Sequence, residues 1–186
     1  MTSAPSNRRT NLFVTGRPGV GKTTLVERVL VLVDVSVGGF VTRELRKNGR
    51  RVGFEIADLS GARGVLAHVD IESEFRVGRY GVNREDLERI GLPAIRNAVA
   101  GARLVVMDEI GRMEMCSPAF MSEVERALES PSVVFGTIQD RGNAFLDAVR
   151  GREDVEVLRV TEENRDRLVE DVVARLEDLL TWRRSL

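Results

Sequence analysis

The sequence predicts an α/β fold with a mainly parallel, doubly wound sheet and helices on both of its faces. Short apolar runs alternate with segments in which apolar residues recur at helical spacing, as strands and helices do in such sheets. A glycine-rich segment at residues 16–23 joins the first apolar run to the first helical one, and the apolar run at residues 103–107 ends in Asp108 and Glu109. Ligands of doubly wound sheets bind at the carboxyl ends of the strands, so both segments are expected at one edge of the sheet.

The glycine-rich segment reads GRPGVGKT and has the composition of a P-loop. Its glycines allow a tight turn whose backbone N–H groups point inward, and the positive end of the following helix lies at the same place. We expect Lys22 to bind the outer phosphates of a nucleotide during catalysis and the Thr23 hydroxyl to coordinate Mg²⁺. The alternative is a glycine-rich turn without a ligand. The residues expected to hold the nucleotide are Gly16, Arg17, Pro18, Gly19, Val20, Gly21, Lys22, Thr23, Thr24 and Asp108.

The next segments predict a helix followed by a hairpin. Residues 23–33 carry apolar side chains at helical spacing. An antiparallel hairpin insertion is expected after this helix, because the extended segments 40–45 and 51–56 flank the turn pair Asn48-Gly49. The hairpin is rich in arginine, but aromatic side chains do not alternate with these charges. We therefore interpret it as a solvated hairpin, with a nucleic-acid-binding surface as the alternative.

The middle of the chain predicts shorter elements. A strand is expected at residues 65–69. An extended, glycine-interrupted piece follows at residues 75–82 and is expected near the bound nucleotide. Asn83 can cap a helix that ends near residue 90, and a second helix with proline in its first turn is expected at residues 93–101.

The second half of the chain continues the alternation of strands and helices. Ser117 can cap a helix that Ser130 closes. Thr161 is expected to begin the last helix. The apolar stripe of that helix is Leu168, Val172, Leu176 and Leu179. The other expected elements are strands at residues 103–107, 133–135 and 155–160 and a short helix at residues 145–149.

Length and composition suit one globular domain. The chain has 186 residues, of which 42% are hydrophobic, and we expect a flexible N-terminus at residues 1–10 and a single domain at residues 11–186. With 28 basic and 29 acidic residues the net charge is −1, which gives no global reason to bind nucleic acid or an anionic membrane. The single cysteine, Cys116, fits a reducing compartment, and no apolar run is long enough to span a bilayer. We therefore expect a cytoplasmic monomer.

The apolar run before Asp108 gives this residue the character of a Walker B carboxylate. Such a residue holds Mg²⁺, here opposite Thr23. Glu109 follows directly, and a second carboxylate at this point can deprotonate a water that attacks the γ-phosphate; the alternative is an ion pair with an arginine. Charge on the γ-phosphate also requires a cation beyond Lys22. The candidates are Arg112, Arg17 and Arg141.

Five short motifs spread along the chain carry a family resemblance. They are GVGKTT at residues 19–24, GFVTRE at 39–44, RVGF at 51–54, DEIGRME at 108–114 and TEENR at 161–165. Together they resemble the cancer-related, or thermophilic, nucleoside-triphosphatase family over nearly the whole chain after residue 10.

The resemblance implies a P-loop fold similar to RecA-like and AAA-type ATPases. It also implies slow, Mg²⁺-dependent hydrolysis of several nucleoside triphosphates to the diphosphate and phosphate. Lys22 and Thr23 would contact phosphate and metal, Asp108 the metal, and Glu109 would be the base. This chain has Arg112 where the family has lysine.

The predicted function is Mg²⁺-dependent hydrolysis of ATP, GTP, CTP and UTP with broad base specificity. The first alternative is a nucleotide or nucleoside kinase whose acceptor lies under the hairpin and residues 75–82. The second is a nucleoside-triphosphatase switch gated by nucleic acid or another partner. For base recognition two interpretations remain: residues 161–165 face the base, or Thr161 serves only as a helix cap.

Overall fold

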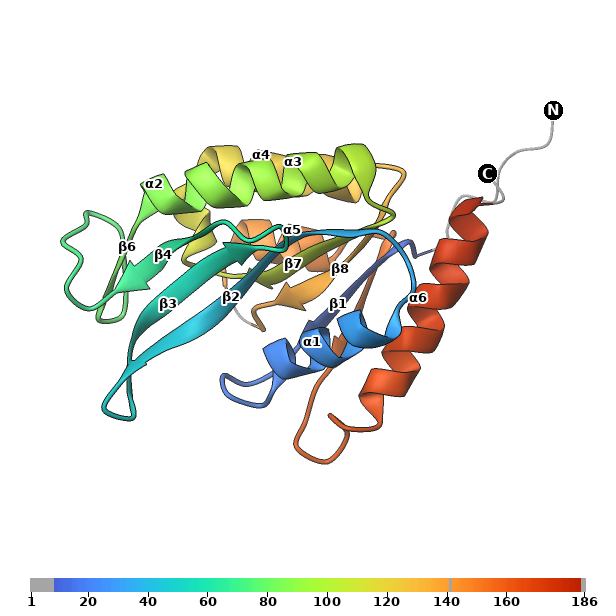
Figure 1. Ribbon diagram of the computed structural model, residues 1–186, viewed down its shortest axis with the longest axis horizontal. Helices are drawn as coiled ribbons and strands as arrows, with labels where there is room; N and C mark the ends of the chain where they lie inside the picture. The colour runs from blue at the N-terminus through green and yellow to red at the C-terminus, as the bar shows by residue number, and fades with distance from the viewer. Residues whose placement is uncertain (1–8, 141, 185–186) are drawn as a thin grey trace.

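In a computed structural model, which describes residues 9–140 and 142–184, the chain forms one nine-stranded sheet (Figure 1). Across the sheet the strand order is β5-β6-β4-β3-β2-β7-β8-β1-β9. Most of the N-terminus expected to be flexible, residues 1–8, lies outside the described residues, and so does Arg141. The strands are β1 (Asn11–Thr15), β2 (Val37–Lys47), β3 (Arg50–Asp58), β4 (Arg63–His68), β5 (Arg76–Val77), β6 (Tyr80–Val82), β7 (Leu104–Ile110), β8 (Val133–Ile138) and β9 (Val155–Arg159).

The sheet has a parallel half and an antiparallel half. The five neighbouring strands β2, β7, β8, β1 and β9 pair in parallel, which confirms the doubly wound arrangement. Strands β3, β4, β6 and β5 continue the sheet with antiparallel pairing. The antiparallel part is thus larger than the predicted hairpin, because β4 and the β5–β6 hairpin add to the same edge.

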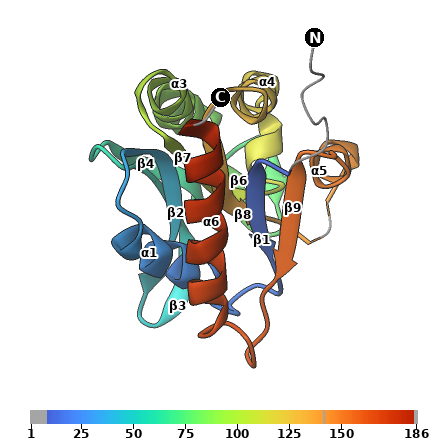
Figure 2. The same cartoon turned by 90° about the vertical axis from the view of Figure 1, so that its right-hand side faces the viewer.

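Helices cover both faces of the sheet (Figure 2). On one face α1 and α6 pack against the sheet, and on the other α3, α4 and α5 do. Strand β1 serves both cores, because Phe13 points to the α3–α5 side while Leu12 and Val14 point to the α1–α6 side. Among the described helices none is long and apolar enough to cross a membrane. The helices are α1 (Lys22–Leu32), α2 (Arg84–Asp86), α3 (Leu92–Gly101), α4 (Pro118–Leu128), α5 (Ala144–Arg150) and α6 (Leu168–Arg184).

The predicted hairpin is confirmed as β2–β3. Asn48 and Gly49 form its turn with φ of 50° and 76°, the left-handed conformation that an Asn-Gly pair adopts easily. Serine and asparagine caps also appear where the sequence predicts them: the Ser117 hydroxyl accepts from the Phe120 N–H at the start of α4. Local capping and turn chemistry therefore determines several of the observed boundaries.

The two helices predicted between residues 83 and 101 form one continuous helical segment. Asn83 caps it, with its side-chain oxygen accepting from the Asp86 N–H at 3.1 Å. A π-helical turn at Leu87–Gly91 joins α2 to α3 just before Pro93. Proline has no N–H for the regular helical hydrogen bond, and the wider turn lets the chain continue without a break.

Two expectations differ from the structure. The last helix begins at Leu168 rather than Thr161, because Thr161 and Asn164 close a separate turn through side chain–backbone hydrogen bonds of 2.8 and 3.3 Å. Residues 75–82 form β5 and β6 at one edge of the sheet, and the strands β4, β3, β2, β7 and β8 separate them from β1. They therefore lie far from the P-loop, not beside it.

Candidate active site

The P-loop connects β1 to α1 at the carboxyl edge of the parallel half of the sheet. Gly19 and Gly21 have φ of 80° and 104°, so two left-handed residues turn the chain into the first turn of α1. Lys22 is only 9% exposed, and its ammonium donates to the Gly16 carbonyl oxygen at 3.2 Å. The loop therefore encloses its lysine, with the positive end of α1 directed to the same place.

Asp108 lies at the end of β7 and is completely buried. The Thr137 hydroxyl, from the neighbouring strand β8, donates to Asp108 Oδ1 at 2.6 Å. The other carboxylate oxygen, Oδ2, is buried without a hydrogen bond of ordinary geometry to a described residue. Burial raises the pKa of Asp108 to about 6, although the hydroxyls of Thr137 and Thr23 and the charge of Lys22 act in the opposite direction. These effects place Asp108 beside the P-loop.

Glu109 is half-buried at the same edge. Burial raises its pKa, and the nearby charge of Lys22 partly offsets this effect. A carboxylate with a raised pKa next to the P-loop can accept a proton from a water molecule bound there. The structure thus brings together four of the predicted residues, two from the start of α1 and two from the end of β7: Lys22, Thr23, Asp108 and Glu109.

Glu114 is a further carboxyl group at this edge that sequence reasoning did not single out as functional. It is 3% exposed, and its Oε2 accepts from the Gly111 N–H at 2.9 Å. Burial and the charge of Glu109 raise its pKa to about 8. The sequence does contain a signal for this group, because Glu114 is a third acidic residue within six positions of Asp108. Its spacing alone, however, does not predict that the Glu114 side chain is buried beside the other two.

Two of the three candidate arginines, Arg17 and Arg112, lie in the P-loop and in the loop after β7. Arg17 and Arg112 are both exposed, and neither guanidinium forms an ion pair with a described residue. The Arg112 N–H donates to the Gln139 side-chain oxygen at 3.0 Å, which ties the loop after β7 to the loop after β8. Both side chains are thus exposed without a carboxylate partner among the described residues, while Arg141 is not among the residues that the structure describes.

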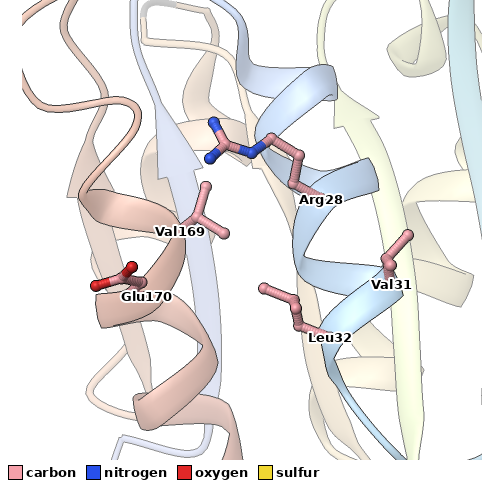
Figure 3. A pocket seen from close by; sticks show the side chains of 5 residues that line it. All are labelled: Arg28, Val31, Leu32, Val169 and Glu170. Atoms are coloured by element: carbon pink, nitrogen blue, oxygen red, sulfur yellow. The ribbon is translucent and has the colours of Figure 1, made fainter.

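Two cavities open beside α1. The one next to the P-loop has a volume of about 310 Å³, and the other, of about 350 Å³, lies farther along between α1 and α6 (Figure 3). The far cavity is lined by Arg28, Val31, Leu32, Val169 and Glu170. The near cavity is lined by Gly21, Thr24, Leu25, Arg28, Arg165 and Asp166.

Comparisons with known proteins agree with this geometry. A sequence model of the family described as NTPase matches residues 11–173. The chain is 40% identical to nucleoside-triphosphatase THEP1 of Thermotoga petrophila, over 87% of this chain and 90% of that protein. It is 42% identical to the human cancer-related nucleoside-triphosphatase, over 88% of this chain and 94% of that protein.

Solved structures show the same fold. The crystal structure of THEP1 from Aquifex aeolicus superposes with a TM-score of 0.83 at 32% identity, covering 90% of this chain and 99% of that one. The solution structure of a human cancer-related nucleoside triphosphatase gives a TM-score of 0.78 at 40% identity, covering 90% and 97%. With a P-loop, a following carboxylate pair and relatives of this similarity over most of its length, the chain belongs to the NTPase family of P-loop nucleoside-triphosphatases.

Proposed function

We propose that this protein hydrolyses nucleoside triphosphates in a Mg²⁺-dependent reaction and accepts ATP, GTP, CTP and UTP. The observation that carries the proposal is the convergence of a P-loop lysine and two raised-pKa carboxyl groups at the carboxyl ends of β1 and β7. The named relatives are nucleoside-triphosphatases, which supports the same reaction class here.

The residues present fit a magnesium ion. Asp108 has a buried carboxylate oxygen without a hydrogen-bond partner of ordinary geometry, and the Thr23 hydroxyl lies near enough to lower the pKa of Asp108. Both are hard oxygen ligands of the kind that Mg²⁺ prefers. No cluster of three or more acidic, histidine or cysteine ligands occurs in the described part of the chain, so water and the triphosphate would supply the remaining ligands. Bound Mg²⁺ would neutralise charge on the β- and γ-phosphates.

The protein side chains divide the chemistry between binding and proton transfer. Lys22 binds the outer phosphates, and the amides of the P-loop hold the chain of phosphates in line. Glu109 takes a proton from the attacking water while the oxygen of that water forms a bond to the γ-phosphorus. The bond between the γ-phosphorus and the bridging oxygen then breaks, and the nucleoside diphosphate leaves with the electron pair. Arg112 is proposed as the cation for charge on the γ-phosphate.

Two alternatives receive less support. A kinase needs an acceptor site, and residues 75–82, one half of the expected acceptor region, lie at the far edge of the sheet. A switch gated by nucleic acid would use the hairpin arginines. Three of these already pair with carboxylates: Arg43 with Glu27 at 2.9 Å, and Arg46 and Arg51 with Glu44 at 2.5 and 2.6 Å.

Phosphate release separates these functions. The purified protein is incubated with each of the four triphosphates, with and without Mg²⁺ and with and without nucleoside or nucleoside monophosphate acceptors. Hydrolysis requires release of phosphate without an acceptor and only in the presence of Mg²⁺. Negligible release alone together with rapid transfer to an acceptor would establish a kinase instead, and stimulation by nucleic acid that disappears with added salt would indicate the gated switch.

Location and assembly complete the proposal. We propose that the protein is a monomer in the cytoplasm. The location is supported by its one cysteine, Cys116, which is half-buried and whose thiol pKa is raised by burial to about 11. Such a thiol is a poor nucleophile and suits a structural role in a reducing compartment. Sedimentation velocity at micromolar concentration tests the assembly state, and a dimer would contradict it.

A further inference from the structure

Arg165 lies against the outer side of the P-loop. Its Nη1 donates to the Val20 carbonyl oxygen at 3.4 Å. A Cβ built on Gly21 would stand 3.8 Å from Arg165 Cδ and 4.0 Å from Nη1, which is ordinary van der Waals contact. The guanidinium therefore lies beside the glycine that precedes α1 and lines the near cavity of about 310 Å³.

The loop that carries Arg165 is fixed from both ends. Strand β9 pairs in parallel with β1, and the Val160 N–H donates to the Thr15 carbonyl at 2.7 Å, so the chain leaves β9 next to the start of the P-loop. Asn164 then donates to the Arg159 carbonyl at 2.9 Å, in addition to its reciprocal bonds with Thr161. The Arg165 N–H donates to the Thr161 carbonyl at 3.0 Å and closes a turn over residues 161–165. These bonds fix the backbone from which the Arg165 side chain extends.

The charge of Arg165 is available to a ligand. Among the described residues no carboxylate pairs with it, although its neighbours are paired: Arg28 with Asp166 at 2.6 Å and Arg159 with Asp140 at 2.7 Å. Asp166 is the only carboxylate that lines the near cavity in the described part of the chain, and its Oδ1 already accepts a hydrogen bond from Arg28. Arg165 thus presents a free planar cation over an open space.

The shape and lining of the cavity suit a nucleoside. Thr24 and Leu25 line it on α1, immediately after the residues proposed to hold phosphate and metal, so a nucleoside attached to the bound phosphates would extend into this cavity. The volume is at the lower end of the range for small-molecule sites. No Asn or Gln is found among its described lining residues, so it contains no side-chain amide that could select one base edge.

We propose that Arg165 binds the nucleobase by stacking its guanidinium on the ring face, in the near cavity beside the P-loop. This inference rests on the proposed function, because the base enters as part of the triphosphate. Every base has a π-face, so a stacked guanidinium contributes affinity without selecting a base. Broad base acceptance then follows from the kind of contact rather than from the absence of a base site.

A contact with phosphate is the main competing role for Arg165, and the geometry disfavours it. Phosphates bind to inward-pointing N–H groups of a P-loop, whereas Arg165 contacts a carbonyl oxygen of the loop. The guanidinium therefore faces an acceptor of the loop rather than the amides that bind phosphate.

Four variants separate stacking from charge. Arg165→Leu removes both the plane and the charge, Arg165→Lys keeps the charge, and Arg165→Phe keeps the plane. Arg167→Leu is the matched control, since Arg167 is exposed two residues farther on and does not line the cavity. Isothermal titration with Mg²⁺ measures the Kd of non-hydrolysable analogues of ATP, GTP, CTP and UTP, and of inorganic tripolyphosphate, which has no base.

We expect Arg165→Leu and Arg165→Lys to raise the Kd of all four analogues about five- to tenfold, more for purines than for pyrimidines, and to leave tripolyphosphate unchanged. Arg165→Phe and Arg167→Leu should stay within about twofold of the parent. The inference is overturned if Arg165→Lys binds like the parent, if tripolyphosphate weakens equally, or if Arg165→Leu changes nothing. Because binding is measured, a parent that binds the analogues without hydrolysing triphosphates would refute the proposed function and leave this test valid.

Discussion

The hydroxyl of Thr137 donates a 2.6 Å hydrogen bond to one oxygen of the buried Asp108 carboxylate, while the second oxygen has no partner of ordinary geometry among the described residues. The bonded oxygen fixes the orientation of the carboxylate and the other is left for a ligand. This division of roles resembles the way in which supporting residues orient metal ligands in general.

Replacement of Thr137 by valine tests that relationship. The variant keeps the shape of the side chain but removes the hydroxyl that donates to Asp108 Oδ1, so the pKa of Asp108 should rise further and Mg²⁺ should bind about tenfold more weakly. Titration of the phosphate-release rate with Mg²⁺ measures the change. Thr15→Val is the control, because the buried Thr15 hydroxyl has no hydrogen-bond partner among the described residues. An unchanged Mg²⁺ midpoint in Thr137→Val would contradict the assignment of Asp108 to the metal.

Glu109→Gln tests the proposed base. The amide keeps the size of the side chain but cannot take a proton, so kcat should fall by a factor of about 10² to 10⁴ while the Kd for a non-hydrolysable triphosphate stays within about twofold. Lys22→Ala provides the contrast, since it removes a binding group and should weaken triphosphate affinity and turnover together. Single-turnover kinetics and titration distinguish the two. Parent-like turnover in Glu109→Gln would remove Glu109 from the mechanism.

Arg112→Ala tests the proposed cation. If the guanidinium neutralises charge that develops on the γ-phosphate, kcat should fall by about one to two orders of magnitude with little change in KM. Arg112→Lys should recover part of the loss because it restores a positive charge. Arg17→Ala, made in parallel, shows which of the two exposed arginines acts. A loss confined to Arg17→Ala would transfer the role to the P-loop.

Glu114→Gln tests the buried carboxyl group through the pH dependence of stability. The pKa of Glu114 is raised to about 8 in the folded protein, against 4.5 ordinarily, so the folded state retains the proton while the unfolded state loses it. Its contribution to stability is complete below about pH 4.5 and is lost as the pH rises toward 8. The variant cannot ionise, so its free energy of unfolding should rise relative to the parent by an amount on the order of 2–4 kcal/mol between these pH values.

Urea unfolding of metal-free protein at several pH values, for the parent and the variant, measures this difference. Glu123→Gln serves as control: this carboxylate is equally buried but is paired with Arg96 at 2.7 Å and Arg126 at 3.1 Å. Its neutralisation should destabilise the protein at neutral pH. Parallel stability curves for Glu114→Gln and the parent would show that Glu114 ionises as readily in the folded state as in the unfolded chain.

Local sequence patterns predicted much of the fold. Asn48-Gly49, Ser117 and Asn83 act through their own backbone neighbours, so their turns and caps appear where expected. The same local chemistry caused the one clear error at a helix boundary: Thr161 has the residue type of a cap, but it closes a single turn with Asn164, and α6 begins seven residues later. Spacing alone does not say whether a turn continues into a helix.

Relations between distant segments were less accessible from the sequence. The P-loop and Asp108 were predicted together because both follow apolar strands and parallel strands end at one edge. Residues 75–82 were misplaced because their position depends on the strand order, and β4 carries them to the outer edge of the sheet. The cavity beside Arg165 also requires three dimensions, since it joins the start of α1 to the loop after β9.

The length of β2 has a consequence for how a substrate approaches. Its parallel pairing with β7 stops at Val41 opposite Asp108, whereas its pairing with β3 continues to Lys47 (Figure 1). The six further residues extend about 20 Å at roughly 3.3 Å each, so the hairpin projects beyond the carboxyl edge of the parallel strands, on one side of the proposed phosphate site. We expect a triphosphate to enter from the open side, with its nucleoside pointing toward α6, and bulky groups attached to the base should therefore be tolerated better than bulky groups attached to the γ-phosphate.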